Sequence, residues 1–335
     1  MILIDSLYIN NGGGKILLDY FVNECEKTNI DVFYLFDKRC ENSYKEISDE
    51  KKVFLKASMY LRFLFYTKNK NRFSKVLCFG NQPPLLKLNC PVFTYFHQPM
   101  FLNIPKEFSF KDKLIFSIKQ NILNRLRKNT DKWIVQNNLI KNGLCDKYRI
   151  AQTEVLVLPF YPNEDLSVNS EIRQSNTFIY VSNATPHKNH KRLFEAFTTF
   201  YDQHKVGELI VTINFDHDMA AYVEKMRMLK YPITNIGFVD RVELIKNYHT
   251  AEYLIFPSLE ESFGLGIVEA IECGCKVIGS DLGYMFQVCQ PSIVFNPLSK
   301  DDIICAFEKA TEKQENATKQ NIFNKIDELM LLLKN

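Results

Sequence analysis

Hydrophobic and polar positions alternate along the first half of the chain in a pattern that predicts strands separated by helices. Short apolar runs, rich in the β-branched and aromatic residues that favour strands, occupy residues 2–7, 32–36, 75–79, 92–96, 133–135 and 155–158. Residues 15–28 and 113–128 have the helical period of 3.6 instead, and each lies between two such runs. Strands that alternate with helices predict a parallel sheet covered by helices on both faces.

The pattern breaks at residues 159–176, PFYPNEDLSVNSEIRQSN, where prolines and polar residues replace the periodic hydrophobic positions. Such a stretch is typical of a linker. The alternation then restarts and continues through the second half. The expected strands are 177–182, 208–214, 235–239, 253–258, 276–280 and 292–297, and the expected helices are 191–201, 219–229, 242–249, 267–273, 301–311 and 321–333.

These elements predict an α/β protein with two Rossmann-like domains that face each other across a cleft. The expected boundaries are residues 1–160 for the first domain, 161–176 for the linker and 177–318 for the second domain. Residues 319–335 form a C-terminal helix that can pack back on the first domain. In open α/β sheets, ligands bind beyond the carboxyl ends of the strands, so we expect the chemistry in the cleft.

Composition supports a globular protein of two domains. The chain has 335 residues, of which 46% are hydrophobic and 24% are charged. No uncharged apolar run reaches the roughly 18 residues that a membrane-spanning helix needs, and the N-terminus, MILIDSLYI, reaches Asp5 too early for a signal peptide. Nine cysteines without C-x-x-C spacing indicate buried thiols in a reducing cytoplasm, and argue against disulfides or a zinc site.

The net charge of +3 conceals a strong asymmetry along the chain. Residues 1–158 carry 25 Lys and Arg against 15 Asp and Glu, and the remainder carries 17 against 24. Residues 51–132 alone carry 17 basic and 3 acidic residues, interleaved with Leu, Ile and Phe. A basic surface with apolar anchors suits an anionic membrane. A solvated helix face in a basic protein accounts for the pattern equally well, and nucleic acid is disfavoured because no binding motif supports it.

The stretch ESFGLGIVEA, residues 261–270, carries the clearest chemical signal. Gly264 and Gly266 allow a tight turn after the strand at 253–258, and the helix expected from 267 would present an N-terminus that attracts phosphate. Two carboxylates beside such a site suit hydroxyl groups, so Glu269, in the first helical turn, would bind a ribose and Glu261 a sugar. A phosphate between two polyols describes a nucleotide-sugar. Two helix-end glutamates favoured by the dipole are the structural alternative.

With FPSLE before it, this stretch resembles the E-x7-E signature of family 4 retaining glycosyltransferases (glycosyltransferases group 1), which have the glycosyltransferase-B fold. Residues 235–258 resemble that family's segment from the nucleobase loop to the strand before the signature. Residues 276–283, KVIGSDLG, resemble the strand after the signature, and residues 180–197, YVSNATPHKNHKRLFEAF, resemble the opening of the second domain. The similarity covers most of 177–300, and the first half matches more loosely.

The resemblance implies roles for individual residues. Glu269 would bind the donor ribose, Glu261 would contact the transferred sugar, and Lys188 would neutralise the diphosphate leaving group as its charge develops. For Lys188 alone, an exposed lysine at a helix N-terminus is the alternative. The other implied donor-binding positions, several of them acting through the backbone, are Ser182, Phe238, Val239, Ser262, Phe263, Gly264 and Leu265.

Two features of the first half fit the same interpretation. NNGGGK, residues 10–15, lies between a strand and a helix, so the amides of Gly13 and Gly14 could reach the diphosphate. It is not a Walker A loop, because Ile16 replaces the Ser or Thr, and a glycine turn without a ligand remains an alternative. His97, in TYFHQPM, stands where a family histidine contacts the donor sugar. A structural histidine is the alternative there.

The chain departs from the family at several positions. Many members carry an arginine a few residues before the lysine, where this chain has Ser182 and Asn183. The second cation would then come from Arg192 or Lys191, or be missing. Two further departures are Gly266, where proline is common, and Gln287, near a frequent glutamate.

Together these features predict a cytoplasmic retaining glycosyltransferase, peripheral at the inner face of the membrane. It would move a hexose from a nucleoside diphosphate sugar to a glycan acceptor, lipid-linked, in the assembly of bacterial surface polysaccharide such as O-antigen, lipopolysaccharide or capsule. The first domain would bind the acceptor. The resemblance implies retention of configuration and no essential metal. The alternatives are a catalytically silent nucleotide-sugar-binding partner and a nucleotide-sugar epimerase or phosphorylase on the same fold.

Overall fold

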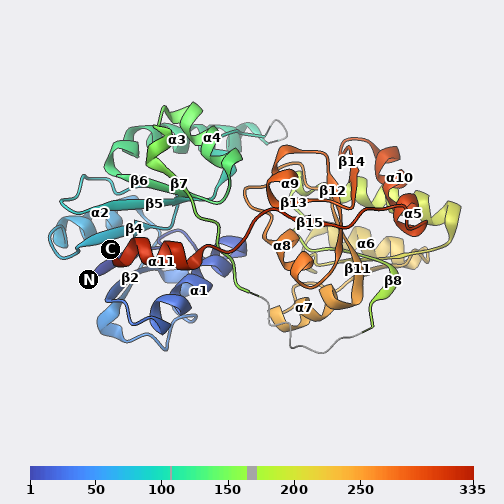
Figure 1. Ribbon diagram of the computed structural model, residues 1–335, viewed down its shortest axis with the longest axis horizontal. Helices are drawn as coiled ribbons and strands as arrows, with labels where there is room; N and C mark the ends of the chain where they lie inside the picture. Colours follow the sequence, from blue (N-terminus) through green and yellow to red (C-terminus); the bar gives the residue numbers. More distant parts are fainter. Residues whose placement is uncertain (106–107, 164–171) are drawn as a thin grey trace. The chain divides into compact units, whose positions relative to one another are not determined.

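The computed structural model describes residues 1–105, 108–163 and 172–335. The chain forms two compact units, and each has its own parallel sheet (Figure 1). The first unit comprises residues 1–162 together with 323–335, and the second comprises 163–322. The C-terminal segment therefore returns to the unit that contains the N-terminus.

Seven parallel strands form the first sheet, in the order β3-β2-β1-β4-β5-β6-β7. Most are buried on both faces, which is why they appear in the sequence as continuous apolar runs. The strands are β1 (Ile2–Asp5), β2 (Val32–Asp37), β3 (Lys52–Leu55), β4 (Lys75–Cys78), β5 (Val92–Phe96), β6 (Lys132–Val135) and β7 (Val155–Val157). The strand order reverses between β1 and β4, so the loops after these two strands meet at a topological switch point.

Helices cover both faces of this sheet: α1 (Gly12–Lys27), α2 (Met59–Lys68), α3 (Phe110–Leu126), α4 (Asn138–Tyr148) and α11 (Ile326–Lys334). Right-handed connections place α1 on one face and α3 and α4 on the other, as Figure 1 shows. A buried ion pair fixes α2: Arg62 Nε donates to Asp5 Oδ2 at 2.7 Å, with 3% and 1% of the two side chains exposed. Tyr66 OH donates to the same oxygen at 2.6 Å.

Hydrogen bonds join α11 to the rest of the first unit. Some involve the carbonyls at the end of the helix, and others involve residues just before its start. Lys75 Nζ donates to the carbonyls of Leu332 at 3.2 Å and Leu333 at 2.9 Å, which lie at the end of α11 and lack partners within the helix. Upstream, Asn324 Nδ2 donates to the carbonyl of Tyr161 at 2.6 Å. Buried Leu329 adds apolar contact area.

Six parallel strands form the second sheet, in the order β10-β9-β8-β11-β12-β14. They are β8 (Gln174–Tyr180), β9 (Glu208–Val211), β10 (Ile233–Asn235), β11 (Ala251–Phe256), β12 (Lys276–Ser280) and β14 (Ile293–Phe295). The order reverses between β8 and β11, so the loops after β8 and β11 lie together at the carboxyl edge.

The helices of the second unit are α5 (His190–His204), α6 (Asp218–Met228), α7 (Arg241–Thr250), α8 (Leu265–Glu272), α9 (Gly283–Val288) and α10 (Lys300–Thr311). A two-stranded antiparallel ladder joins β13 (Cys289–Gln290) to β15 (Lys319–Gln320). The helix α5 has an apolar stripe that buries Leu193, Phe194, Phe197 and Phe200.

The structure corrects several predicted elements. The strand expected at 235–239 is β10, which ends at Asn235, so the rest of that stretch is a loop. The helix expected at 321–333 begins only at Ile326. The short edge strand β3 and the helices α2, α4 and α9 were not predicted. Of the predicted linker 161–176, residues 164–171 lie outside the described residues, and the last three belong to β8.

Across 1–105, 108–163 and 172–335, no helix combines the length and apolar character needed to cross a bilayer.

Candidate active site

The signature loop runs from the end of β11 to the start of α8. The helix begins at Leu265, two residues earlier than predicted, because Gly264 ends the loop in the left-handed conformation with φ +74°. A Cβ atom at Gly264 would lie 2.8 Å from Cδ1 of Ile267. The left-handed backbone therefore favours glycine there, and the end of the Ile267 side chain would have to shift to admit a Cβ atom. Glu269 consequently lies in the second turn of α8, and its predicted place in the first turn is wrong.

Hydrogen bonds tie this loop to the loop that follows β8. The amide of Leu259 donates to the carbonyl of His187 at 2.8 Å, and Asn189 Nδ2 donates to the carbonyls of Pro257 at 3.2 Å and Pro297 at 2.7 Å. On the other side, Tyr284 OH donates to the carbonyl of Ser258 at 2.7 Å. The two strand-end loops at the switch point are therefore held as one structure.

This arrangement brings Lys188 and Glu261 into contact. Lys188 Nζ donates to Glu261 Oε1, and only 16% and 13% of the two side chains are exposed. The turn that carries Lys188 is fixed by Tyr180 OH, which donates to the Lys188 carbonyl at 2.9 Å. A fixed cation next to a carboxylate, at the carboxyl edge of a parallel sheet, can bind an anion and a hydroxyl group side by side.

Glu269 is buried on α8, with 4% of its surface exposed. Its Oε1 lies 2.9 Å from Arg241 Nη1, at the start of α7. Burial raises the pKa of Glu269 above its ordinary value. Arg241 opposes that rise and Glu272 adds to it. Arg241 was missed in the sequence because no spacing rule connects it to a carboxylate 28 positions later.

The predicted nucleobase positions, Phe238 and Val239, lie in the loop between β10 and α7. Phe238 is 92% exposed. The loop is held by Asn235, whose Oδ1 accepts hydrogen bonds from the amides of Ile213 at 2.9 Å and Gly237 at 3.1 Å. The backbone there is thus fixed while the Phe238 ring points away from the protein interior.

The remaining predicted donor positions belong to the two tied loops. Ser182 follows β8; its amide donates to Thr212 Oγ1 at 3.1 Å and its hydroxyl to the Asn183 carbonyl at 3.1 Å. Ser262, Phe263 and Leu265 lie within or directly after the signature loop, and Phe263 is buried.

The two predicted replacements for the family's arginine already have partners. Arg192 Nη1 donates to Asn189 Oδ1 at 2.6 Å and to the Pro297 carbonyl at 3.2 Å, so Arg192 supports the loop. Lys191 is 75% exposed and pairs with Glu195 at 4.0 Å.

In the first unit, the glycine loop and the predicted histidine lie together. The helix α1 begins at Gly12, so Gly13 and Gly14 belong to its first turn, where backbone amides lack partners within the helix. A Cβ atom at Gly14 would lie 3.2 Å from His97 Nε2, which places the imidazole directly against this turn. A Cβ atom at Gly13 would meet no atom within 4 Å.

Asn81 orients His97. Its Oδ1 accepts from the His97 amide at 2.7 Å, which turns Nδ2 toward His97 Nε2 at 3.4 Å. Because Nδ2 is a donor, Nε2 acts as the acceptor and the proton resides on Nδ1. Burial lowers the pKa of His97 to about 4, so the ring is neutral at physiological pH. Asn81 was missed in the sequence because nothing in NQPP marks its left-handed backbone, with φ +66°.

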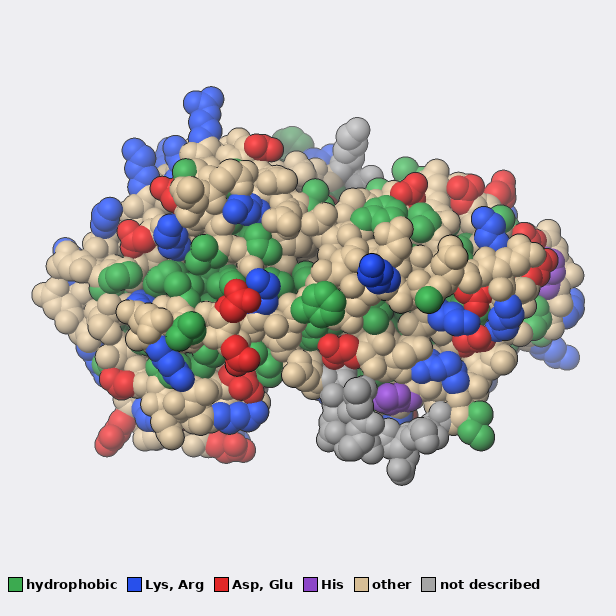
Figure 2. Space-filling view, in the orientation of Figure 1, with side chains coloured by type: hydrophobic (Ala, Val, Ile, Leu, Met, Phe, Trp, Pro, Cys, Tyr) green, Lys and Arg blue, Asp and Glu red, His purple; other side chains and the backbone are tan. Residues whose placement is uncertain are grey.

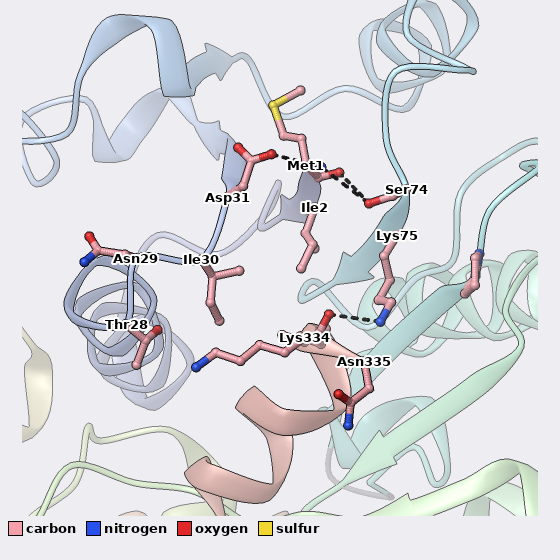
Figure 3. A pocket seen from close by; sticks show the side chains of 12 residues that line it. Met1, Ile2, Thr28, Asn29, Ile30, Asp31, Ser74, Lys75, Lys334 and Asn335 are labelled. Atoms are coloured by element: carbon pink, nitrogen blue, oxygen red, sulfur yellow. Dashed lines mark hydrogen bonds and ion pairs between the residues drawn. The ribbon is translucent and has the colours of Figure 1, made fainter.

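A cavity of about 610 Å³ lies elsewhere in the first unit (Figure 3). Its lining includes Met1, Asp31, Ser74, Lys75 and Lys334. In Figure 3 the Met1 amine pairs with Asp31, at 3.0 Å. The cavity lies at the amino ends of β1 and β4, opposite the edge where open α/β sheets bind ligands. None of the predicted site residues lines it, so it is not the candidate active site.

Within the described ranges, no group of three or more His, Cys, Asp or Glu side chains is placed to hold a metal ion.

Comparison with known proteins identifies the fold and the family. The family model for glycosyl transferases group 1 matches residues 163–325, which include Lys188, Glu261 and Glu269. This part of the chain matches the group 1 glycosyltransferases. The match confirms the predicted resemblance for these residues.

Curated relatives are similar to this chain over part of their length. The serotype-specific mannosyltransferase WbdA of Escherichia coli is 37% identical over 75 residues, which are 22% of this chain and 9% of WbdA. The O-antigen chain mannosyltransferase RfbU of Salmonella typhimurium is 22% identical over 212 residues, which are 63% of this chain and 59% of RfbU. The alignments therefore span less than two thirds of these relatives.

Solved structures confirm the predicted fold class. The lipopolysaccharide outer core galactosyltransferase WaaB, in its apo form, matches with a TM-score of 0.65 at 16% identity, over 99% of this chain and 94% of WaaB. Sucrose-phosphate synthase from Thermosynechococcus elongatus matches with a TM-score of 0.68 at 17% identity, over 92% and 88% of the two chains. At these identities the likeness shows the glycosyltransferase-B fold, with its two parallel-sheet domains, and no more.

Proposed function

We propose that this glycosyltransferase moves a hexose, with retention of configuration, from a nucleoside diphosphate sugar to a glycan acceptor. The observation that carries the proposal is the contact between Lys188 and Glu261 at the switch point of the second sheet. It joins a cation suited to a diphosphate to a carboxylate suited to sugar hydroxyls. Retention of configuration is carried over from the resemblance to family 4. From the same resemblance we propose that the enzyme needs no metal ion.

The donor diphosphate would bind between Lys188 and the start of α8. The N–H groups of Leu265 and Gly266 lie ahead of the helix's own hydrogen bonds, which begin with the Ile267 amide donating to the Gly264 carbonyl at 2.8 Å, and the helix dipole favours an anion. When the bond from the sugar to the diphosphate breaks, negative charge accumulates on the leaving oxygen. A lysine fixed beforehand stabilises that charge without reorganising.

Glu261 would exchange one partner for another during donor binding. In the structure its Oε1 accepts from Lys188. A bound donor offers Lys188 the phosphate oxygens and offers Glu261 the sugar hydroxyls, so each charged group keeps a partner. The pair thus holds both side chains in place before the donor arrives, which lowers the conformational entropy lost on binding.

Within the first unit, Gly13, Gly14 and His97 lie together and would offer groups that suit a sugar hydroxyl and an anion. Because burial keeps the pKa of His97 near 4, the ring would offer neutral hydrogen-bonding atoms to a sugar hydroxyl and would not act as a cation at neutral pH. The first-turn amides at Gly13 and Gly14 would meet phosphate oxygens.

For the sugar, we propose mannose as the first candidate. The relatives WbdA and RfbU are both named mannosyltransferases, and RfbU is named for the O-antigen chain. The acceptor would accordingly be a lipid-linked glycan of a bacterial surface polysaccharide, bound by the first unit.

A lipid-linked acceptor requires the enzyme to work at a membrane, and α3 carries a surface suited to an anionic one. Phe110, Leu114 and Ile118 recur every four residues along α3 and are 85%, 53% and 52% exposed. Lys111 and Lys113, also exposed, lie among them. Figure 2 shows Lys and Arg side chains projecting along the upper edge of the first unit, over α3 and α4. We therefore place the enzyme in the cytoplasm, peripheral at the inner membrane face.

The test is product analysis with purified enzyme, GDP-mannose and UDP-sugars as donors, and polyprenyl-linked glycans as acceptors. A glycosidic product of retained configuration, lost in Glu261→Ala while nucleoside diphosphate still binds, is the expected result. Release of an epimerised nucleotide-sugar without acceptor would contradict a transferase that acts on these acceptors. Nucleotide binding without turnover on any donor would instead favour a silent binding partner.

A further inference from the structure

The carboxylate proposed to bind the donor ribose is held from outside its own helix. Glu269 Oε1 lies 2.9 Å from Arg241 Nη1, and Arg241 is the first residue of α7. The start of α7 is itself fixed, because Asp240 Oδ1 accepts from the Glu243 amide at 2.9 Å. Glu269 is 4% exposed whereas the Arg241 side chain is 36% exposed, so the arginine reaches from the surface to a buried carboxylate.

The position of Arg241 does not favour the stability of α7. A cation in the first turn of a helix is opposed by the helix dipole, which prefers negative charge there. An ion pair with one partly exposed member contributes little to folding. The placement of Arg241 is therefore better explained by what it does to Glu269 than by what it does for its own helix.

Among the residues that the structure describes, few other charges act on Glu269. On its own helix, Glu272 disfavours the ionised form. The neighbouring α7 also brings the Tyr248 phenol toward α8, where its oxygen would lie 3.1 Å from a Cβ atom at Gly266. The charged groups at the amino ends of β11 and β12 are paired elsewhere: Lys276 lies 2.6 Å from Glu315 and 3.9 Å from Glu252. Arg241 is thus the opposing cation that favours an ionised Glu269.

We propose that Arg241 is a positioning residue for the nucleotide: it keeps Glu269 ionised and fixes the plane of its carboxylate so that it accepts the ribose hydroxyls of the donor. An ionised carboxylate accepts from both hydroxyls, whereas a protonated one loses acceptor capacity. The contact from Arg241 Nη1 to Glu269 Oε1 fixes the orientation of the carboxylate. The inference rests on the proposed function, in which Glu269 is the ribose ligand.

The test is calorimetric titration from pH 6 to pH 9 with whichever of UDP, GDP, ADP and CDP binds most tightly. We expect wild-type affinity to change little over this range. Arg241→Met should bind about tenfold more weakly near pH 6.5, the loss expected if only about a tenth of its Glu269 is ionised there, and should recover toward wild type as the pH rises and Glu269 ionises again. Arg241→Lys, which keeps the charge, should lie between the two.

A second ligand distinguishes positioning from direct contact. With the 2′,3′-dideoxy form of the same nucleotide, which has no ribose hydroxyls, the difference between wild type and Arg241→Met should fall below about twofold. An equal loss on both nucleotides would mean that Arg241 contacts the base or the diphosphate, and would overturn the proposal. Arg227→Met is the matched control, because Arg227 pairs with Glu224 on the exposed face of α6; it should bind both ligands as wild type does.

Failure of the inference and failure of the proposed function give different results. If Glu269→Ala binds the nucleotide as tightly as wild type, Glu269 is not the ribose ligand and that part of the proposed function fails. If Glu269→Ala binds weakly but Arg241→Met matches wild type at every pH, only the role of Arg241 is wrong.

Discussion

At the scale of single residues, the second unit presents charged groups that are already paired. Lys188 contacts Glu261, and Arg241 contacts Glu269. Under the proposed function, a donor would replace the contact between Lys188 and Glu261, whereas Arg241 would keep its contact with Glu269, so the site would not have to order free side chains. The first pair can be tested by replacing Lys188, and the second by replacing Glu269.

Removing the ammonium group of Lys188 should slow transfer more than it weakens binding. The cation matters most when charge develops on the diphosphate, so Lys188→Met should lower kcat by about 10²–10³-fold, as loss of one preorganised electrostatic contact does elsewhere. Steady-state kinetics with the donor identified by product analysis would measure it. Lys191→Met is the control, because Lys191 lies three positions further along the chain, in the first turn of α5, and its side chain is exposed. Equal kcat values in both variants would show that Lys188 has no such role.

Replacing Glu269 by glutamine should stabilise the ligand-free protein at neutral and alkaline pH. The pKa of Glu269 is raised in the folded state, so ionisation costs the folded protein stability as the pH rises through that pKa, and glutamine cannot ionise. The melting temperature of Glu269→Gln should therefore exceed that of wild type near pH 8. The difference should vanish toward pH 4, where both side chains are uncharged. A constant difference at all pH values would exclude ionisation as its cause.

At the scale of helices and strands, periodic segments were predicted well and loops less so. Both sheets, and the position of α5, followed from apolar runs and a clear 3.6-residue period. The helix α2, MYLRFLFYTK, was missed because its aromatic residues conceal that period. Short β3, KVFL, was missed because it is an edge strand of only four residues that is half-buried and begins with a lysine.

The site was predicted as a set of positions along the chain, and the contacts between them were not. The spacing of Glu261 and Glu269, and the strand before them, marked the signature loop. Tertiary contacts over long separations, such as Arg241 with Glu269 and Asn81 with His97, leave no local pattern in the sequence. They became visible only when the sheet brought distant loops together.

The turn into α8 offers a test at this scale. Gly264→Ala introduces a Cβ atom into a left-handed backbone and 2.8 Å from Ile267, so it should destabilise the protein by about 1–3 kcal/mol. Gly13→Ala is the matched control, since its Cβ atom would meet no atom within 4 Å and alanine favours a helix. Chemical denaturation would compare the two variants. Equal stability would mean that the turn at Gly264 tolerates a side chain.

At the scale of the whole molecule, positive net charge is concentrated in the first half of the chain, where residues 1–158 carry 25 Lys and Arg against 15 Asp and Glu. If α3 meets an anionic bilayer, replacing Phe110, Leu114 and Ile118 together by serine should remove most binding to vesicles that contain phosphatidylglycerol. Each lost side chain is worth on the order of 1–2 kcal/mol of buried apolar area. Co-sedimentation at low and at physiological salt would measure it.

The control for that measurement lies in the second unit. Met228 and Leu229, at the end of α6, are 76% and 60% exposed. Serine at both positions removes a similar apolar area far along the chain from α3, and vesicle binding should persist. If neither variant binds less than wild type, or if wild type ignores anionic vesicles, the membrane surface proposed for α3 is wrong.

The return of the C-terminal segment to the first unit has a consequence for how the chain folds as it is synthesised. Residues 1–162 leave the ribosome before the second unit. The sheet that they form lacks α11, one of the helices that cover it, until residues 323–335 follow the entire second unit. Until then, the surface that Ile326, Leu329, Met330 and Leu333 cover remains exposed to water. The second unit, continuous in sequence, can complete its fold before the first. A nascent first unit is therefore a natural substrate for chaperones that bind apolar surface.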